Sequence, residues 1–458
     1  MTRSISSMLL ATFVLRVSTS VTGGMLVYLV DELTRNRGTG PGALSLLTGG
    51  FYTTELTGAI LFGVLADRYG RKVVMLLGPV FGSAAVFMTG LTTQLPVLFV
   101  TRLLEGSSTA ASVPSTLGFI AAETSHDEQL RGRVVALFEL VSLGGMLAVG
   151  PWLAGHLWET LGRQAFFLNC FFYLLALCLY AYGVREAPRR RDAAQAARSV
   201  ATVRMEFLRY WRLATSRSVL LFAPTWLAIN AILGLWALQA PLLLRGNIHD
   251  PSQFLMKGVS AGAIGNGSAA LAIVFGLGLL FWGSVYSRFR RTTMLLVGVC
   301  AFVVMALDIL AINHLGGTST GLLILLVAVA VVALFVMSGA TPAALGLLAD
   351  VSEGFEEDRS AIMGLYSVFL GLGQVLGAVL GGIFASWRGI DGLLLATALL
   401  LVVGLVALAN LRGSDGAGLN DALRNGAAAP SLAASRARLS GVAGTLELPV
   451  DDSTEEKR

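Results

Sequence analysis

Long apolar segments recur along the chain, and short polar stretches separate each from the next. The hydrocarbon core of a bilayer is about 30 Å thick, so a helix that crosses it needs about 20 mostly apolar residues. Segments of this length predict about twelve transmembrane helices. They cover residues 8–31, 43–66, 73–93, 96–121, 134–158, 165–184, 218–244, 267–287, 293–313, 320–348, 361–386 and 391–411.

The composition excludes the soluble alternatives. Of 458 residues, 55% are hydrophobic and 13% are charged, and the mean hydropathy is +0.73. A soluble protein carries about 25% charged residues, and soluble monomers rarely expose the large apolar patches that this chain would have. We therefore expect an all-α membrane protein. Arg16 interrupts the first apolar segment, which favours a retained helix over a cleaved signal peptide.

Arginine and lysine gather in every second loop. Such residues are Arg68, Arg71, Lys72, Arg131, Arg133, Arg288, Arg290, Arg291 and the nine arginines between Arg185 and Arg217. Cytoplasmic loops of membrane proteins carry an excess of these residues. The distribution, with its net charge of +5, predicts cytoplasmic N and C termini in a multi-pass protein of the cell (plasma or inner) membrane.

An arginine-rich segment, residues 186–216, divides the predicted spans into six and six. Its partly amphipathic stretch 193–213 could lie along the anionic membrane surface, or it could be a solvated linker that only sets topology. We predict two six-helix bundles, residues 1–185 and 217–412, joined by this cytoplasmic linker. Residues 413–458 are rich in Gly, Ala, Ser and charge, which predicts a disordered cytoplasmic tail.

The two halves resemble each other in sequence. Gly118–Glu123, at the end of the fourth span, matches Gly346–Asp350 at the end of the tenth, a shift of about 228 residues. The loop Gly63–Arg71 has a weaker partner in Gly283–Arg291. Parallel six-helix repeats with a site between them near the midplane of the bilayer are typical of alternating-access transporters.

The most specific motif is the stretch 63–72, GVLADRYGRK. Its second glycine, Gly70, permits a tight turn, and its charges offer charge-assisted hydrogen bonds. The stretch closely resembles the signature between helices two and three of the major facilitator superfamily. The resemblance covers about residues 1–412, and it implies a pseudo-symmetric twelve-helix fold and secondary active transport.

The resemblance also implies a cytoplasmic gate that latches when the transporter opens outward. In it Asp67 would face the start of the eleventh span, Arg71 would pair with Glu123, and Arg131 would complete the network. The full set is Gly63, Asp67, Arg68, Gly70, Arg71, Glu123 and Arg131, with Asp350 and Arg359 as the counterpart in the second half. The alternative is a turn that sets topology, with exposed charges worth about 0–1 kcal/mol each.

Two further motifs point to export. Arg102, followed four residues later by Gly106, is similar to the family pattern of an intramembrane arginine. The segment containing Gly150, Pro151 and Gly155 is similar to the motif of antiporters in this superfamily, although Ala154 and Met146 stand where glycines are usual. A packing kink is the alternative interpretation of the Gly-Pro pair. The motifs favour proton-coupled efflux of a small amphiphilic or drug-like molecule; the alternative is uptake by symport or facilitated diffusion.

Five charged residues lie within predicted spans of the first half: Arg16, Glu55, Arg102, Glu105 and Glu139. Each would cost about 2.5–3.5 kcal/mol if it were unpaired at the bilayer centre, so we expect these residues to face a cavity, pair or bind protons. A carboxylate in a low-dielectric site holds a proton more strongly than one in water. Glu55 is the first candidate for proton coupling and Glu139 the second. A static Arg16–Glu55 ion pair and direct substrate contact are the alternatives.

Helices seven and eleven line the cavity in this family. The resemblance therefore marks Asn230, Trp236, Gln239, Tyr366 and Gln374 as candidates for substrate contact. The partners we expect are a small-molecule substrate, protons and the lipid bilayer, with no nucleic acid and a monomeric state. The sequence contains no phosphate-binding Gly-x4-Gly-Lys-Ser/Thr loop and no His-Glu-x2-His motif. We expect no cofactor, no metal site and no enzymatic activity.

Overall fold

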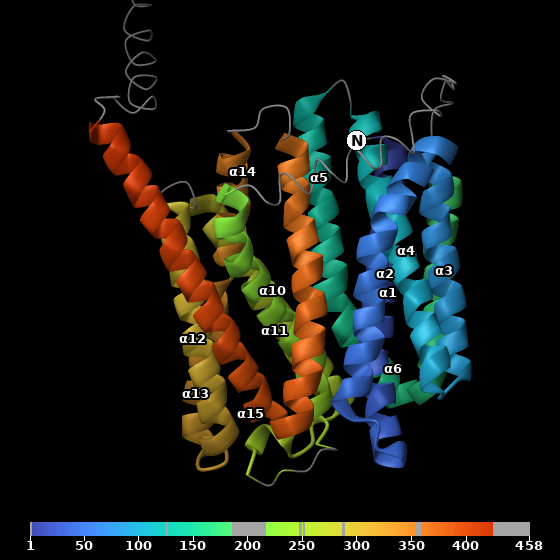
Figure 1. The fold of residues 1–458 in the computed structure, drawn as a ribbon. Helices are drawn as coiled ribbons and strands as arrows, with labels where there is room; N and C mark the ends of the chain where they lie inside the picture. Colours follow the sequence, from blue (N-terminus) through green and yellow to red (C-terminus); the bar gives the residue numbers. More distant parts are fainter. Residues whose placement is uncertain are drawn as a thin grey trace, which may run out of the picture. The chain divides into compact units, whose positions relative to one another are not determined.

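The structure, a computed structural model, consists of helices and their connections in the part of the chain that it describes (Figure 1). It describes residues 2–124, 127–185, 217–246, 250, 252–285, 289–353 and 359–424. The first half forms α1 (Arg3–Arg37), α2 (Gly40–Tyr69), α3 (Arg71–Leu91), α4 (Leu95–Glu123), α5 (Glu128–Leu143), α6 (Gly150–Leu161) and α7 (Ala165–Cys178). The second half forms α10 (Arg217–Leu244), α11 (Ala261–Val285), α12 (Arg291–Leu315), α13 (Thr320–Met337), α14 (Ala340–Glu353) and α15 (Arg359–Arg424). A π-helical segment, Gly144–Val149, connects α5 directly to α6.

Eight stretches of the described residues are long and apolar enough to cross a membrane. Two of them, Leu130–Gly183 and Val368–Arg412, have 54 and 45 residues, which suffices for two crossings each at about 20 residues per crossing. α2 and α4, with 30 and 29 residues, coincide with two further predicted spans. The predicted all-α membrane fold is confirmed, while the cytoplasmic placement of the termini stays a prediction.

Two glycines reverse the direction of the chain between helices. Gly70, with a φ of +104°, separates α2 from α3 at the position where the sequence predicts a tight turn. Gly389, with a φ of +58°, follows Arg388, which is itself outside the helical region, and breaks α15 into two helices. Positive φ is accessible to glycine at little cost because it has no Cβ. The break in α15 falls between the predicted eleventh and twelfth spans.

Three close helix contacts occur twice, once in each half. They are Gly58–Ala110 and Gly278–Ser338, Gly78–Ser112 and Gly298–Ala340, and Arg71–Gly118 and Arg291–Gly346. From the first half to the second, the residue number of the first partner rises by 220 and that of the second partner by 228. Gly58 thus corresponds to Gly278, and Ala110 to Ser338. These are the offsets of the sequence repeat, so the two halves pack their helices in the same way. The halves are called the first and second repeat below.

Buried polar contacts hold α1 against α7 inside the first repeat. The side-chain amide of Asn169 donates to the Ser18 carbonyl at 2.9 Å and to the Thr22 hydroxyl at 2.8 Å. The hydroxyl of Thr12 lies 3.0 Å from that of Tyr180, in the π-helical segment Leu179–Gly183 that follows α7. Because polar groups inside a membrane protein have little access to water, such paired groups stabilise one arrangement of the helices.

The chain divides into two compact units, residues 1–408 and 409–458. Of the second unit the structure describes residues 409–424, which form the last part of α15. The helix thus continues past residue 413, where the sequence predicted that the disordered tail begins; a helix that has already formed extends at little cost per residue. The predicted linker, 186–216, and the rest of the tail, 425–458, lie outside the described residues.

Candidate transport pathway and gates

Three of the predicted coupling residues come together from α1, α2 and α5. Arg16 interacts electrostatically with both Glu55 and Glu139. Within the described ranges, no hydrogen bond and no ion pair of 4.0 Å or less joins these side chains. Arg16 and Glu55 are partly exposed and Glu139 is exposed. Unpaired charges at membrane depth require water nearby, so these three side chains indicate a hydrated lining on the first repeat.

The other two predicted coupling residues form a buried ion pair. Arg102 and Glu105 lie three positions apart on α4, and their side chains are 5% and 1% exposed. The guanidinium of Arg102 donates to Oε2 of Glu105. Oε1 of Glu105 accepts a hydrogen bond of 3.3 Å from the Tyr173 hydroxyl on α7. This pair therefore belongs to the packed interior of the first repeat.

In the second repeat, the described side chains that were predicted to contact substrate bind or pack against other residues of the protein. The side-chain amide of Asn230 donates to the Trp226 carbonyl of its own helix at 2.8 Å. The Trp236 indole donates to the Thr397 hydroxyl at 2.8 Å. Gln239 is buried, and Gln374 lies against Gly234. The side chain of Tyr366 lies outside the described part of the chain.

An ion pair joins the two repeats at the end of the bundle where α1 finishes and α2 begins. We call this the outer end, after the orientation that the arginine distribution predicts. Asp31 on α1 accepts from Arg245, which follows α10, at 3.1 Å, and from Arg35 on its own helix at 3.1 Å. The Asp31 side chain is 2% exposed. The Tyr28 hydroxyl donates to the Ala261 carbonyl of α11 at 3.3 Å, which adds a second bond between the repeats.

Further polar contacts join the repeats at the outer end. The side-chain amide of Gln239 on α10 donates to the Ser45 hydroxyl on α2 at 2.8 Å and to the Pro41 carbonyl at 3.4 Å. The Glu159 carboxylate on α6 accepts from the Ser260 side chain and from the backbone N–H of Gly262. Together with the Asp31–Arg245 pair, these contacts hold the outer end closed. Gln239 therefore has a role between the repeats rather than a free side chain.

The antiporter-type motif lies where α6 crosses α11 and approaches α1. A Cβ at Gly155 would overlap the Ala261 carbonyl group, and one at Gly150 would overlap the Ser20 side chain. In turn, a Cβ at Gly265 would lie 2.9 Å from the Pro151 carbonyl oxygen. Small residues permit this close approach of membrane helices. The motif thus serves as a packing surface between the repeats in this structure.

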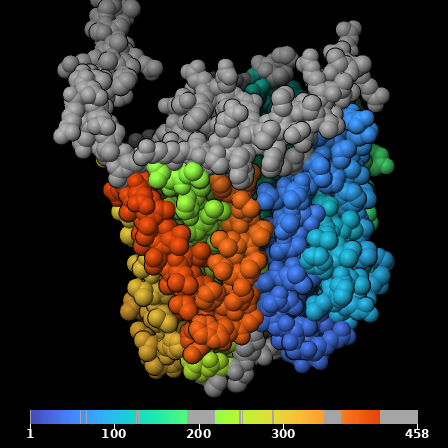
Figure 2. Space-filling model, in the orientation of Figure 1, coloured from blue at the N-terminus to red at the C-terminus, as the bar shows by residue number. Residues whose placement is uncertain are grey.

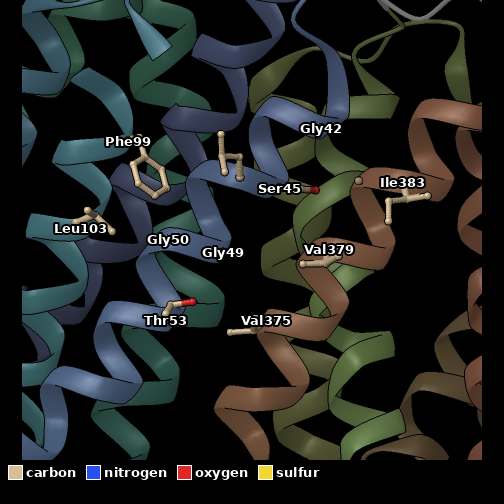
Figure 3. Close-up of a pocket in the computed structure, with 12 residues that line it drawn as sticks. Gly42, Ser45, Gly49, Gly50, Thr53, Phe99, Leu103, Val375, Val379 and Ile383 are labelled. Atoms are coloured by element: carbon tan, nitrogen blue, oxygen red, sulfur yellow. The ribbon is translucent and has the colours of Figure 1, made fainter. Parts of the chain in front are cut away.

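An apolar groove lies on the seam between the repeats. Figure 2 shows the first repeat, in blue, beside α15, in orange, on one face of the protein. The groove has a volume of about 470 Å³, and its walls come from α2, α4 and α15, with Phe99 and Leu103 facing Val375, Val379 and Ile383 (Figure 3). Leu46 and Ile383 at its rim are 60% and 61% exposed. The lining of the groove is mostly apolar, as hydrocarbon is. In this it differs from the charged side chains of Arg16, Glu55 and Glu139 on the first repeat.

Most residues of the predicted cytoplasmic gate lie at the opposite ends of the helices. Gly63 and Arg68 are on α2, Gly70 forms the turn, and Arg71 begins α3 with its side chain against Gly118. Glu123 ends α4 and is exposed, and the Arg131 guanidinium donates to the Thr124 carbonyl at 3.4 Å. The side chains of Asp67, Asp350 and Arg359 lie outside the described residues. The pairings proposed for them stay predictions.

No local sequence pattern predicts the contacts at the outer end. The spacing of Asp31 and Arg35, four positions apart, is typical of a pair on one helix. Nothing in the spacing relates Asp31 to a residue 214 positions away; that relationship follows only from the packing of the repeats.

The family profile described as Major Facilitator Superfamily matches residues 8–256 and 251–442 of the chain. The chain belongs to the major facilitator superfamily. It is accordingly a membrane transporter, and the two matches agree with the two structural repeats. The motif at residues 63–72 thus predicted the correct family.

The relatives of this chain include proteins named for resistance to drugs. The chain is 30% identical over 151 residues to multidrug resistance protein 1 of Bacillus subtilis, 33% of this chain and 38% of that protein. It is 25% identical over 350 residues to the MFS-type transporter YuxJ of the same organism, 76% of this chain and 82% of that protein. The quinolone resistance protein NorA of Staphylococcus aureus is 24% identical over 144 residues, 31% of this chain and 36% of that protein.

Solved structures of the superfamily share the fold. The nucleoside transporter NupG superposes with a TM-score of 0.67 at 12% identity, over 90% of this chain and 99% of that chain. A bacterial homologue of the lysosomal transporter Spinster, in an inward-facing and occupied conformation, gives a TM-score of 0.66 at 14% identity, over 92% of this chain and 99% of that chain. At these identities the likeness shows the fold alone.

Proposed function

We propose that this protein exports a small amphiphilic molecule across the cell membrane in exchange for protons, as a monomer. The observation that carries the proposal is the unpaired arrangement of Arg16, Glu55 and Glu139 on the first repeat. A carboxylate that lacks a fixed partner can exchange a proton with water, and it can therefore bias a conformational equilibrium according to its protonation. The drug resistance proteins among the relatives support export and a drug-like substrate.

The contacts between the repeats at the outer end stabilise one conformation of the transport cycle. Alternating access requires that the ends of the two repeats separate in turn around a central site. With Asp31 paired to Arg245 and Gln239 bonded to Ser45, the outer end is closed. Proton binding to Glu55 or Glu139 from outside would then require these contacts to open. The predicted cytoplasmic gate, with Asp67 as its acidic member, would close the inner end in that second state.

Transport in inverted membrane vesicles tests the proposal, with ethidium as the probe because it is an aromatic, amphiphilic cation. An imposed gradient, acidic inside, should drive ethidium into the vesicles in exchange for protons. Glu55→Gln should abolish this accumulation and spare exchange of ethidium for ethidium, because only the proton step is lost. Glu32→Gln, which removes a carboxylate near the outer end of α1, is the matched control and should transport normally.

Two outcomes would contradict the proposal. If Glu55→Gln still accumulates ethidium with the gradient, Glu55 is not the coupling residue. If the wild-type protein accumulates the probe only when protons move in the same direction, symport replaces antiport.

For the inner gate, Asp67→Ala should slow turnover while leaving the amount of folded protein unchanged, and unaltered turnover would reject the gate.

A further inference from the structure

The groove on the seam between the repeats is deep because side chains are missing from its floor. Gly42 and Gly49 on α2 both line it (Figure 3), and at this spacing they lie on one face of the helix, about two turns apart. Among the described residues, a Cβ at either position would meet no atom within 4 Å. The groove is therefore open space in front of bare backbone, and the protein itself does not fill it.

The walls of the groove come from both repeats and leave little for a polar ligand to bind. Of the two lining residues with hydroxyl groups, Ser45 already accepts a hydrogen bond of 2.8 Å from the Gln239 amide. The other, Thr53, lies at the end of the groove that is farther along α2. A Cβ at Gly382 of α15 would overlap the Ser45 side chain, so the two repeats touch beside the groove. An occupant would thus be apolar and would contact both repeats.

The groove has the length of one leaflet of the bilayer. It follows α2 from Gly42 to Thr53, which is about 16 Å at the rise of an α-helix. One leaflet contributes half of a hydrocarbon core that is about 30 Å thick. Because α2 begins at the outer end, the groove lies in the outer half of the membrane-spanning region. The surroundings at this depth are acyl chains, and the volume of about 470 Å³ is typical of a ligand site.

A basic and an aromatic side chain lie at the outer end of the helices that form the groove. Arg37, the last residue of α1, donates to the Thr93 carbonyl at 3.1 Å and to the Thr93 hydroxyl at 3.3 Å, just before α4 begins. Arg37 is exposed and has no carboxylate within 4.0 Å in the described ranges. On α15, Trp387 follows Ile383 by one turn and is 63% exposed. Tryptophan is enriched at the level of lipid headgroups, and arginine binds phosphate.

We propose that the groove binds one acyl chain of an anionic phospholipid from the outer leaflet, with the lipid phosphate at Arg37. Because the walls belong to different repeats, the chain fits only while the outer end is closed. A ligand that binds one conformation stabilises it, so the lipid favours the closed outer end. This inference does not depend on the direction of transport, on proton coupling or on the transported substrate.

Photocrosslinking in vesicles tests the lipid site. The probe is phosphatidylglycerol with a diazirine in its acyl chain, mixed into phosphatidylcholine vesicles that contain the full-length protein, and peptide mass spectrometry locates the crosslinks. Leu46 and Ile383 at the groove are 60% and 61% exposed, while Leu277 and Leu280 on α11 are 57% and 68% exposed. At this similar exposure the groove residues should crosslink in higher yield. Equal yields would mean ordinary contact with bulk lipid and would overturn the proposal.

A leucine on the floor of the groove should displace the chain. Gly49→Leu should lose the crosslinks at Leu46 and Ile383, and Gly42→Leu serves the same purpose if the first variant does not fold. Gly276→Leu on α11 is the matched control, because a Cβ there also meets no atom within 4 Å among the described residues. This control should keep the groove crosslinks. Groove crosslinks that persist in folded Gly49→Leu would overturn the proposal.

The headgroup is tested with a second probe. Phosphatidylcholine that carries the same diazirine chain should crosslink at Leu46 and Ile383 in lower yield, because it has no net negative charge. Arg37→Gln should lower the yield from phosphatidylglycerol to that of phosphatidylcholine. Equal yields from the two lipids in the wild type would overturn the assignment of an anionic lipid.

Other occupants give distinct results. If added ethidium removes the lipid crosslinks, the groove belongs to the transported molecule, and if crosslinked dimers replace them, it belongs to a second copy of the chain. Either result overturns the proposal.

Spin labels at the exposed positions Thr160 and Thr318, in protein without its natural cysteines, test the effect on conformation by electron–electron double resonance. The outer-closed fraction should be larger in phosphatidylglycerol vesicles than in phosphatidylcholine vesicles, and Gly49→Leu should abolish this difference. A wild-type protein that shows no such difference would overturn the stabilisation of the closed outer end.

Discussion

Asp31 on α1 and Arg245 after α10 form an ion pair of 3.1 Å that joins the two repeats at the outer end. The same carboxylate oxygen, Oδ2, also binds Arg35, on the same helix as Asp31, at 3.1 Å. The two arginines thus make comparable contacts to one atom, but only Arg245 connects the repeats. If the outer end opens during transport, the Asp31–Arg245 bond breaks and the Asp31–Arg35 bond does not.

Arg245→Ala should therefore shift the protein toward outer-open conformations, whereas Arg35→Ala should not. A hydrogen bond to a charged group contributes about 1.5 kcal/mol, so the equilibrium should change by about tenfold. Spin labels at the exposed positions Asn36 and Ala263, in protein without its natural cysteines, report the separation of the outer ends by electron–electron double resonance. An equal response of the two arginine variants would show that Arg245 acts only as a general charge at this end.

The hydrogen bonds of Asp250, in the connection between α10 and α11, predict that the order of residues 252–256 is sensitive to acid. Its carboxylate accepts from the Ser252 hydroxyl at 2.6 Å, from the Gln253 amide at 2.9 Å and from the Ser252 N–H at 3.0 Å. These bonds, the one from the Ser252 hydroxyl above all, hold the pKa of Asp250 below its usual range. Because the folded-state pKa is depressed, the contribution to loop order is present above the ordinary aspartate range and is lost as the pH falls through the folded value.

Hydrogen exchange over residues 252–256, corrected for the intrinsic effect of pH on exchange, measures this order. Protection should decrease as the pH falls below the ordinary range of aspartate. Asp250→Asn should abolish this decrease, because the amide does not titrate. A pH dependence that persists in Asp250→Asn would assign the effect to another group.

Local patterns in the sequence were sufficient for the helices and the family, and insufficient for the contacts between repeats. Gly70 was recognisable because a glycine between two apolar spans marks a turn, and the structure gives it a φ of +104°. Arg102 and Glu105, three positions apart, were placed on one helix face, and the structure pairs them. Both relationships lie within a few residues of chain, where helical geometry alone fixes what is adjacent.

Contacts between distant segments had no such signature. Gln239 was expected to face the substrate because of the helix on which it lies, but its amide binds Ser45 on α2. That partner depends on how closely α10 and α2 approach, which follows only from the packing of the two repeats. For the same reason the sequence marked Gly150, Pro151 and Gly155 as a motif without revealing that α11 lies against them.

The packing of α6 against α11 leads to a last prediction, for which the chain supplies its own control. A Cβ at Gly155 would overlap backbone atoms of Ala261, whereas a Cβ at Gly144 would meet no atom within 4 Å. Backbone cannot move aside as a flexible side chain can, and overpacking costs about 1–3 kcal/mol. Gly155→Ala should therefore lower the thermal stability of the purified protein and loosen the outer end, and Gly144→Ala should do neither. If the two variants are equally stable, the close approach of α6 and α11 is not part of the dominant conformation, and the closed outer end loses one of its supports.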